Sequence, residues 1–364
     1  MTSALSLADA KRLWDPRPGF LNTGNYGLPP RPAFDALRHA EDQWQRGEVD
    51  WPVWTVSVED ARREFGRIIG VPPDRIATGA AVSQLLAPVA AAVPDGGVVL
   101  VPELEFTSAV FPFAVHEKRG VTVRTAPLAQ LADSIQLDTD VVALAPVQSA
   151  TGEIADLRAI VDRAREVGAL VVADATHAAS WVELDVDRID IGVAAAYKWL
   201  CSPRGTAFQW FGADLADRHP AFAERLLPLA AGWFAAPTIH SAYYGMPLRL
   251  AENARRFDIS PAWHCWVGAA PALKILADVG PAAIGSHNID LGDRLLEALG
   301  HPARGSAIVS VAVSEDALDR LHAANVRFAV RDGRARFAFH LYNTGEDADL
   351  VAALLGPRAG TARR

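Results

Sequence analysis

Cysteine is scarce in this chain of 364 residues, in which Cys201 and Cys265 are the only two. Two thiols are too few for a disulfide framework or a four-ligand zinc site, and their scarcity suits a reducing cytoplasm. We therefore expect a cytoplasmic protein without a structural metal. His264 stands next to Cys265, but no second pair follows at metal-ligand spacing, so a structural role is favoured for both.

Long apolar runs and basic clusters are also missing. Nowhere do eighteen apolar residues follow one another, and the N-terminal segment carries charges where a signal peptide would be apolar. Acidic residues outnumber basic ones by 43 to 35, which gives a net charge of −8. A surface that neutralises nucleic-acid phosphates is therefore not expected. The composition predicts a soluble protein with neither a membrane nor a nucleic acid as partner.

Motifs of several common enzyme classes are absent as well. The chain has no GxSxG nucleophile elbow, no GxGxxG after a predicted strand, no GxxxxGK[ST] loop and no HExxH pair. Serine-hydrolase, dinucleotide-binding, P-loop and zinc-protease chemistry are therefore disfavoured.

Regular alternation of short apolar runs and amphipathic segments begins at Ile76. The runs, each predicted to be a strand, are 98–101, 121–124, 141–145, 170–173, 191–194 and 206–211. The helices predicted between them are 83–92, 108–119 and 156–167. Strands and helices that alternate at this spacing predict an α/β fold with a mainly parallel sheet covered by helices. Half of the residues are apolar, which is enough for a substantial core.

The segments on either side of this region predict a second, smaller unit. Further helices are expected at 31–47, 58–69, 215–229 and 262–279, with a turn or cap at 258–261 before the last of them. The tail predicts a compact α+β unit with a helix at 290–299, a strand at 307–313, a helix at 315–323, an Asp-Gly hairpin around 331–334 and a helix at 346–355. We expect a large domain at 31–260, a small C-terminal domain at 261–364, and a segment 1–30 that contributes to the small domain and the active site. Trp44, Trp51 and Trp54 are expected to form an aromatic cluster with a packing role.

The stretch 170–205 holds three residues suited to pyridoxal 5′-phosphate chemistry. Asp174 ends one apolar run, His177 follows it, and Lys198 ends the next run. Such an enzyme needs a Schiff-base lysine, an anion beside the pyridine nitrogen and a hydrogen-bond donor for the phenolic oxygen. On its own each residue also has an ordinary interpretation: a solvent-facing lysine, a helix-capping aspartate and a structural histidine.

A phosphate cradle and a carboxylate clamp have candidates elsewhere in the chain. In TGAAVSQL, the amides of Ala80 and Ala81 and the hydroxyl of Ser83 stand where a turn opens into a helix, a favourable place for an anion. Arg336 lies on a predicted short strand, where its planar fork suits a carboxylate. Small-residue turns and surface ion pairs are common, so the local sequence alone does not decide whether these two segments bind a phosphate and a carboxylate.

Together these motifs resemble the class V aminotransferase family of fold type I pyridoxal phosphate enzymes, which includes cysteine desulfurases, isopenicillin N epimerase and kynureninase. The resemblance lies in D-A-T-H at 174–177, the lysine at 198, the glycine at 205 and R-F-A-F-H-L-Y-N-T at 336–344. It extends from LNTGNYG near the N-terminus to YNTGEDADL near the C-terminus, which is nearly the whole chain.

The resemblance implies a role for each matching residue. Lys198 is the Schiff-base lysine and Asp174 the partner of the pyridine nitrogen. His177 and Gln148 are the residues at the phenolic oxygen, and Phe106 stacks on the pyridine ring.

On the substrate side, the family pattern makes Arg336 the residue that holds the α-carboxylate, with Asn25 placed as a second substrate-binding residue. The family also implies a homodimer whose sites are finished by the partner subunit, and 231–245 is the loop expected to be donated.

Three departures from the family pattern bear on function. Ala81 replaces a threonine, and Ala195-Ala196-Tyr197 replaces Ser-x-His, so two side-chain phosphate contacts are missing unless Tyr197 supplies one. No cysteine lies in 300–336, which disfavours sulfur relay through a persulfide. We predict amino-group transfer from an α-amino acid, with β-elimination (C–S lyase) or epimerisation as alternatives and a non-catalytic binding scaffold as a further one.

Overall fold

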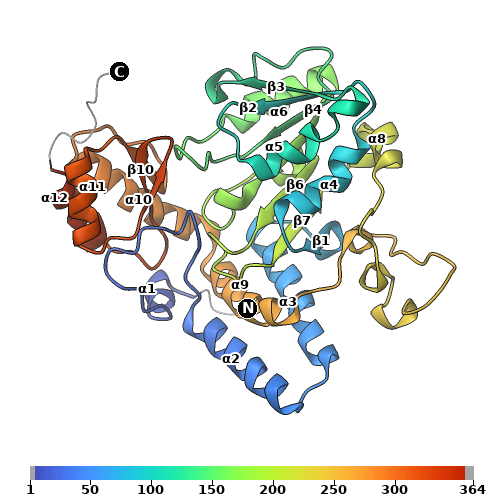
Figure 1. The fold of residues 1–364 in the computed structure, drawn as a ribbon, viewed down its shortest axis with the longest axis horizontal. Coiled ribbons are helices and arrows are strands. Elements are labelled where there is room, and N and C mark those ends of the chain that lie inside the picture. Colours follow the sequence, from blue (N-terminus) through green and yellow to red (C-terminus); the bar gives the residue numbers. More distant parts are fainter. Residues whose placement is uncertain (1–4, 357–364) are drawn as a thin grey trace.

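A seven-stranded sheet forms the centre of the computed structural model, which describes residues 5–356 (Figure 1). Its strand order is β1-β7-β6-β5-β4-β2-β3. The strands are β1 (Ile76–Gly79), β2 (Val98–Pro102), β3 (Thr122–Ala126), β4 (Val141–Leu144), β5 (Leu170–Asp174), β6 (Ile191–Ala195) and β7 (Ala207–Phe211). β7 runs antiparallel to β1 and β6, whereas the other neighbours are parallel. The predicted mainly parallel α/β sheet is confirmed, and β1 is an additional strand that was not predicted.

Helices cover both faces of this sheet. Those in contact with its strands include α3 (Trp51–Ile69), α4 (Val82–Ala92), α5 (Thr107–Ala114) and α6 (Leu157–Val167). α9 (Trp263–Val279) packs on α3, α2 (Arg31–Arg46) packs on α9, and α10 (Pro281–Ala298) leads from α9 to the C-terminal unit. Successive strand residues point to opposite faces, so Val99 joins the cluster that contains Leu85 of α4, and Leu100 joins the cluster that contains Ile160 of α6. Burial on both faces explains why these strands are continuous apolar runs rather than alternating ones.

A smaller unit follows in the C-terminal part, as predicted. Three antiparallel strands in the order β8-β10-β9 pack with α10 and two further helices. Their bounds are β8 (Ile308–Val311), β9 (Ala329–Arg331), β10 (Arg334–Ala338), α11 (Glu315–Ala323) and α12 (Gly345–Leu355). Asp332 and Gly333 join β9 to β10 with φ of 48° and 68°, as a two-residue hairpin turn requires.

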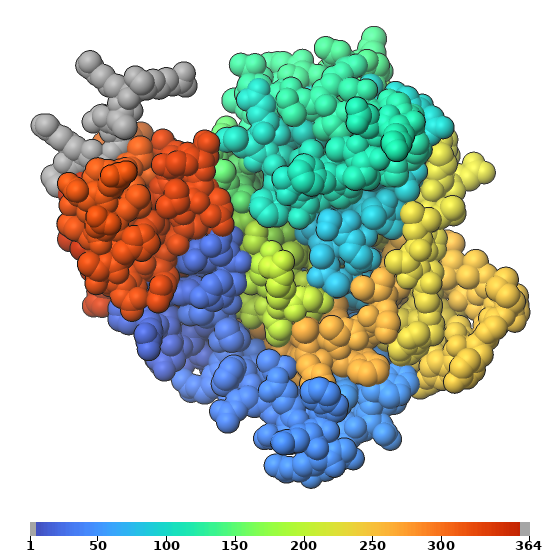
Figure 2. All heavy atoms as spheres, in the orientation of Figure 1, coloured from blue at the N-terminus to red at the C-terminus, as the bar shows by residue number. Residues whose placement is uncertain are grey.

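The N-terminal segment connects the two units. It begins with the short helix α1 (Leu7–Lys11), and isolated bridges then join Phe20 to Arg327 and Asn22 to Ala338. Figure 2 shows this blue segment between the red C-terminal unit and the green part of the chain. The domain boundaries after residues 30 and 260 stay predictions, and their ends at 1–4 and 357–364 lie outside the described residues.

Several predicted helix bounds are wrong. The helix expected at 215–229 is two short ones, α7 (Leu215–Arg218) and α8 (Pro220–Arg225), because a proline lacks the N–H and clashes with the preceding turn. α3 begins at Trp51 rather than at residue 58, and α10 begins at Pro281 rather than at residue 290. α5 ends at Ala114, five residues before the predicted end. α9 begins after Ala262, whose side chain makes no cap, so the predicted cap at 258–261 is wrong.

Asp258 is instead the centre of a buried ion pair. Its carboxylate accepts hydrogen bonds from Arg62 Nη1 and Nη2 at 3.2 and 2.6 Å and from the Thr78 amide at 2.7 Å. These contacts fasten α3 and β1 to the chain that leads into α9.

The predicted tryptophan cluster is confirmed as a packing feature. Trp51 stacks on Trp263 with ring centroids 5.4 Å apart, and Trp54 and Trp44 both contact His264. Residues 226–250, drawn in yellow, form a lobe at the edge of the molecule beside this cluster (Figure 2).

Among residues 5–356, no single helix is both long and apolar enough to cross a membrane. The bent pair α9 and α10 passes such a test only jointly, by length and composition, and its two helices meet at 84°.

Candidate active site

A cavity of about 130 Å³ opens at the carboxyl ends of the parallel strands. The predicted residues that line it are Ala80, Ala81, Ser83, Phe106, Asp174, His177, Tyr197 and Lys198. They come from the ends of β1, β2, β5 and β6, which the parallel arrangement brings to one edge of the sheet. Residues far apart in the sequence therefore meet where the strand-end argument predicted a site.

Lys198 is buried in this cavity, with 7% of its surface exposed. Its Nζ lies 2.9 Å from Nε2 of His177, and Trp199 Nε1 donates to Nδ1 of the same imidazole at 3.2 Å. An indole nitrogen only donates, so Nδ1 accepts and the neutral ring carries its proton on Nε2. A hydrogen bond from Nε2 to Nζ then requires an uncharged lysine amine.

Electrostatics shifts the titration of Lys198 toward the same uncharged form. Burial lowers the pKa of Lys198 to about 8, against the pull of Asp174 and with help from Arg336, Arg331 and Arg204. Burial also holds the pKa of His177 well below its usual range. The solvent-facing alternative for Lys198 is therefore excluded, and its amine is suited to attack a carbonyl carbon.

Asp174 is buried at the end of β5. One carboxylate oxygen accepts from the Thr176 amide at 3.0 Å, so the capping interpretation also holds, and Thr176 Oγ1 accepts from the Ala195 amide at 2.9 Å. Burial raises the pKa of Asp174, opposed by Thr176 and by the charge of Lys198. No cation of the described chain forms an ion pair with it, which leaves a carboxylate suited to a protonated ring nitrogen.

Phe106 lines the cavity, whereas Gln148 lies behind it and contacts the lining residue Glu105. The Phe106 ring lies 5.2 Å from Lys198 Nζ and is 45% exposed, so one face is open for stacking. Gln148 Nε2 donates to Glu105 Oε2 at 3.1 Å, and its buried Oε1 has no partner. The structure thus holds the Gln148 amide against a carboxylate that was not predicted.

Glu105 is that carboxylate, and it lines the same cavity. It also accepts from the amides of Phe106 at 2.8 Å and Ala145 at 2.7 Å. Burial raises the pKa of Glu105 to about 7, against these hydrogen bonds and with help from Asp174. An acid at the end of a strand was the sequence signal that identified Asp174, but the acid directly after β2 is Glu103, so this signal does not single out Glu105.

The turn before α4 presents free backbone donors. The Ala80 amide donates to Gln84 Oε1 at 3.1 Å and is occupied, contrary to the prediction that it faces an anion. Within the described chain, the amides of Ala81, Val82 and Ser83 have no acceptor, and Ala81 supplies no side-chain cap. Three free amides at a helix N-terminus form a cradle for an anion.

Arg336 lies beside the cavity and is 1% exposed. Its Nη1 donates to Ser149 O, its Nη2 to Asn25 Oδ1 at 2.8 Å, and its Nε has no partner. Arg331 donates to the same Asn25 oxygen at 2.7 Å. Burial, with Arg331 nearby, lowers the pKa of Arg336 to about 10.

Arg62 shows what a buried arginine normally requires. It is also 1% exposed, but Asp258 and Glu59 raise its pKa although burial opposes them. Arg336 has no carboxylate at ion-pair distance anywhere in residues 5–356. A buried guanidinium without a counterion is suited to an incoming carboxylate.

The loop 24–27 lies against the backbone of Lys198 and the guanidinium of Arg336. A Cβ on Gly27 would lie 2.0 Å from Lys198 O, and one on Gly24 would lie 2.9 Å from Arg336 Nη2. Glycine is therefore required where this loop crosses the lysine and the arginine.

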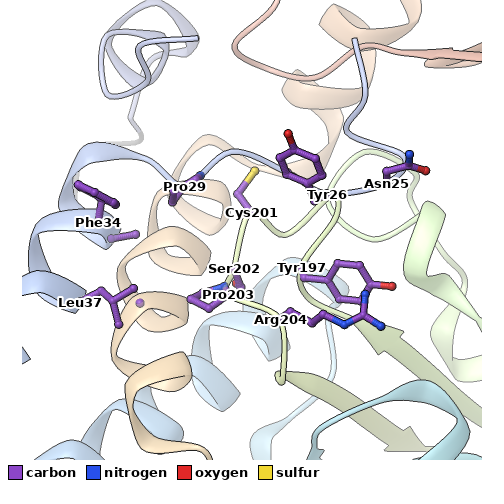
Figure 3. A pocket seen from close by; sticks show the side chains of 13 residues that line it. Asn25, Tyr26, Pro29, Phe34, Leu37, Tyr197, Cys201, Ser202, Pro203 and Arg204 are labelled. Carbon is purple, nitrogen blue, oxygen red and sulfur yellow. The ribbon is translucent and has the colours of Figure 1, made fainter. Parts of the chain in front are cut away.

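A second cavity of about 430 Å³ adjoins the first and shares Tyr197 and Arg204 with it (Figure 3). Figure 3 shows the loop residues Asn25 and Tyr26 on one side and Phe34 on another.

A search of protein families found that residues 53–311 match the model described as aminotransferase class-V. The chain belongs to the class V aminotransferase family. The predicted resemblance is confirmed.

Curated relatives of this family member carry several names. It is 26% identical to the uncharacterized aminotransferase YcbU of Bacillus subtilis, over 87% of this chain and 88% of that one. It is 27% identical to isopenicillin N epimerase of Streptomyces clavuligerus, over 79% of this chain and 76% of that one. These relatives support the family and leave the reaction open.

Solved structures confirm fold type I. The cystine C–S lyase C-DES, in complex with cysteine persulfide, has a TM-score of 0.80 at 20% identity and covers 94% of this chain and 98% of its own. A C-DES variant with glycine covalently linked to its pyridoxal phosphate cofactor has the same TM-score and identity, with coverage of 93% and 96%. At this identity the likeness concerns the fold.

Pyridoxal phosphate is the cofactor of this class V enzyme, and the residues present fit it. A buried amine with a lowered pKa, a buried carboxylate without a cation and three free amides surround one cavity. Each is complementary to one part of the cofactor: its aldehyde, its ring nitrogen and its phosphate.

Proposed function

We propose that the protein catalyses amino-group transfer from an α-amino acid. The observation that carries this proposal is the buried amine of Lys198, whose pKa is lowered to about 8 and which lies 2.9 Å from His177 and in one cavity with Asp174. An uncharged amine in a buried site is the nucleophile that a carbonyl cofactor needs.

Each predicted residue receives a role in holding the cofactor. Lys198 holds it covalently, and Asp174 pairs with its ring nitrogen. His177 and Gln148 bond its phenolic oxygen, and Phe106 stacks on its ring. The phosphate cradle is proposed at Ala80, Ala81, Ser83 and Tyr197, although the Ala80 amide already donates to Gln84 Oε1.

Pyridoxal phosphate, when bound, supplies an aldehyde that condenses with amines and a ring that accepts electrons from the α-carbon. Arg336 binds and orients the α-carboxylate of the substrate, and Asn25, already bonded to it, aligns the guanidinium. Lys198 Nζ moves the α-proton, because a pKa of about 8 lets it both accept and return a proton near neutral pH.

Sulfur relay through an enzyme thiol is disfavoured. The two thiols of the chain are Cys201 and Cys265, and burial raises the pKa of both. Neither is a ready thiolate nucleophile. The relative named an aminotransferase, matched over 87% of this chain, supports amino-group transfer over elimination and epimerisation.

A homodimer with shared sites is part of the proposal. The lobe at 226–250 exposes apolar side chains, among them Tyr244 at 91% and Met246 at 83%. Such a patch suits contact with a second copy, and its segment 231–245 is the part proposed to reach the partner's site.

Borohydride reduction of the purified protein followed by peptide mass spectrometry tests the centre of this proposal. We expect a pyridoxyl adduct on Lys198, and an adduct on any other residue contradicts it. A panel of amino acids is then assayed for keto acid, sulfide and loss of chirality. Keto acid formed in step with conversion of an amino acceptor supports transfer. Sulfide released together with keto acid and ammonia, and without an amino acceptor, assigns elimination, and racemised substrate without keto acid assigns epimerisation.

A further inference from the structure

The phosphate cradle lacks a cation of its own. The side chains of Ala81, Val82 and Ser83 bring no charge, and Ala195 and Ala196 occupy the positions before Tyr197. Free amides and hydroxyls bind a phosphate, but a dianion in a partly buried cavity also needs charge compensation. A cation from another element must supply it.

Arg204 lies where such a cation is needed. It lines the same cavity as the turn before α4, and its Cζ is 4.8 Å from the centroid of the Tyr197 ring. Lys198 Nζ lies 5.7 Å from the same centroid, so one ring contacts both the lysine and the guanidinium. Figure 3 shows the Arg204 guanidinium beside the Tyr197 ring.

The backbone that carries Arg204 is held in place. Its carbonyl accepts from Cys265 Sγ at 3.2 Å, and Thr206 Oγ1 donates to Pro203 O at 2.8 Å. Gly205, with φ of 105°, then turns the chain into β7. Arg204 thus stays on the short connection between the lysine and the next strand.

No carboxylate of residues 5–356 forms an ion pair with Arg204, although the chain carries a net charge of −8. The charge of Arg204 also helps to lower the pKa of Lys198, after burial and the other two arginines, which places it within electrostatic reach of the reacting amine. Arg336 already serves the substrate carboxylate in the function proposed above. Arg204 therefore remains for the second anion of the site.

We propose that Arg204 binds the phosphate of the cofactor and replaces the side-chain contacts that Ala81 and Ala195 cannot make. This inference rests on the cofactor site proposed above. Stacking on Tyr197 orients the guanidinium, whose fork then supplies two donors to phosphate oxygens. Tyr197 acts here as a positioning residue for the arginine.

The test compares two ligands that differ only in the phosphate group. Cofactor-free protein is titrated with pyridoxal phosphate and with pyridoxal, and the dissociation constants are measured by absorbance. The variants are Arg204→Gln, Arg204→Lys and, as a matched control, Arg38→Gln. Arg38 is exposed and lies over an aromatic ring, 5.8 Å from the centroid of Phe34, but away from the cradle.

We expect Arg204→Gln to weaken pyridoxal phosphate binding about 10- to 100-fold and pyridoxal binding less than about twofold, as loss of a charge-assisted contact predicts. Arg204→Lys should retain part of the preference, and Arg38→Gln should match the wild type. Inorganic phosphate should compete with pyridoxal phosphate more weakly in Arg204→Gln.

Three results overturn the inference. An equal loss of affinity for both ligands means that Arg204 has a structural role, and unchanged affinities mean that Arg204 does not bind the phosphate. A higher KM for the amino acid with an unchanged preference for pyridoxal phosphate places it at the substrate instead. If the wild type itself forms no adduct at Lys198, the proposed function fails and the inference fails with it. The three results above, obtained with a wild type that does form the adduct, contradict only the role of Arg204.

Discussion

Arg336→Met, compared with Arg62→Met, separates an arginine kept for a substrate from one kept for stability. Both side chains are 1% exposed, and methionine fills much of the same space without charge. Arg62 is paired with Asp258, which is 0% exposed, whereas Arg336 donates only to neutral acceptors such as Asn25 Oδ1.

The magnitudes follow from these partners. Arg62→Met leaves Asp258 buried and unpaired, which should lower the free energy of unfolding by about 3–5 kcal/mol. The pKa of about 10 for Arg336 means that its charged form is destabilised by roughly 3 kcal/mol. Arg336→Met removes that penalty together with its hydrogen bonds, each worth about 1 kcal/mol, so the net change should be within about 1 kcal/mol.

Activity should show the opposite order. Loss of the contact to a substrate carboxylate should cost about 2–5 kcal/mol, so kcat/KM of Arg336→Met should fall by at least about 30-fold. Stability is measured by urea unfolding followed by tryptophan fluorescence, at one protein concentration for all variants. The reasoning is refuted if Arg336→Met loses as much stability as Arg62→Met, or if it retains wild-type kcat/KM.

Three further predictions concern the lysine, the loop above it and the unpredicted acid. The rate of covalent capture of pyridoxal phosphate by Lys198 should rise about tenfold per pH unit and level off above about pH 8, because only the uncharged amine attacks. A capture rate that is flat from about pH 6 to 9 contradicts the assignment. Gly27→Ala should abolish cofactor binding, since its Cβ would lie 2.0 Å from Lys198 O. Gly345→Ala, whose Cβ would meet only the end of the exposed Arg294 side chain at 3.1 Å, should retain it, and the cofactor content of the purified variants decides. Burial raises the pKa of Glu105 to about 7, so the folded state binds a proton that the unfolded state has lost, and the free energy of unfolding should fall as pH rises from about 4.5 to 7. Glu105→Gln should remove this fall, as measured by urea titrations at several pH values. An unchanged dependence on pH in Glu105→Gln would show that Glu105 does not cause it.

The sequence predicted the residues that stand at strand ends. Asp174, His177 and Lys198 lie within one stretch, and a polar residue after a buried apolar run is a local signal that needs no tertiary information. The same argument predicted the order of strands and helices, because buried parallel strands must be apolar on both faces. Helix bounds around α7 and α8 were less predictable, since the pattern of apolar residues continues past Pro220 although the backbone cannot.

Contacts between distant parts of the chain were decided only by the tertiary structure. Asn25 meets Arg336 across 311 residues, and Arg62 meets Asp258 across 196. Glu59, one helical turn before Arg62, is a counterion that the sequence could indicate, but nothing near either arginine predicts these distant partners. Glu105 and Arg204 likewise enter the site through packing rather than through a motif.

The protein by its sequence alone is a class V aminotransferase relative with a lysine, an acid and an arginine in family positions. The pKa of the Lys198 amine was decided only by the fold, because it depends on burial and on neighbours from several strands. The pKa of Lys198 is lowered to about 8 because burial in the cavity disfavours the charged amine, and Trp199 fixes the imidazole of His177 beside it.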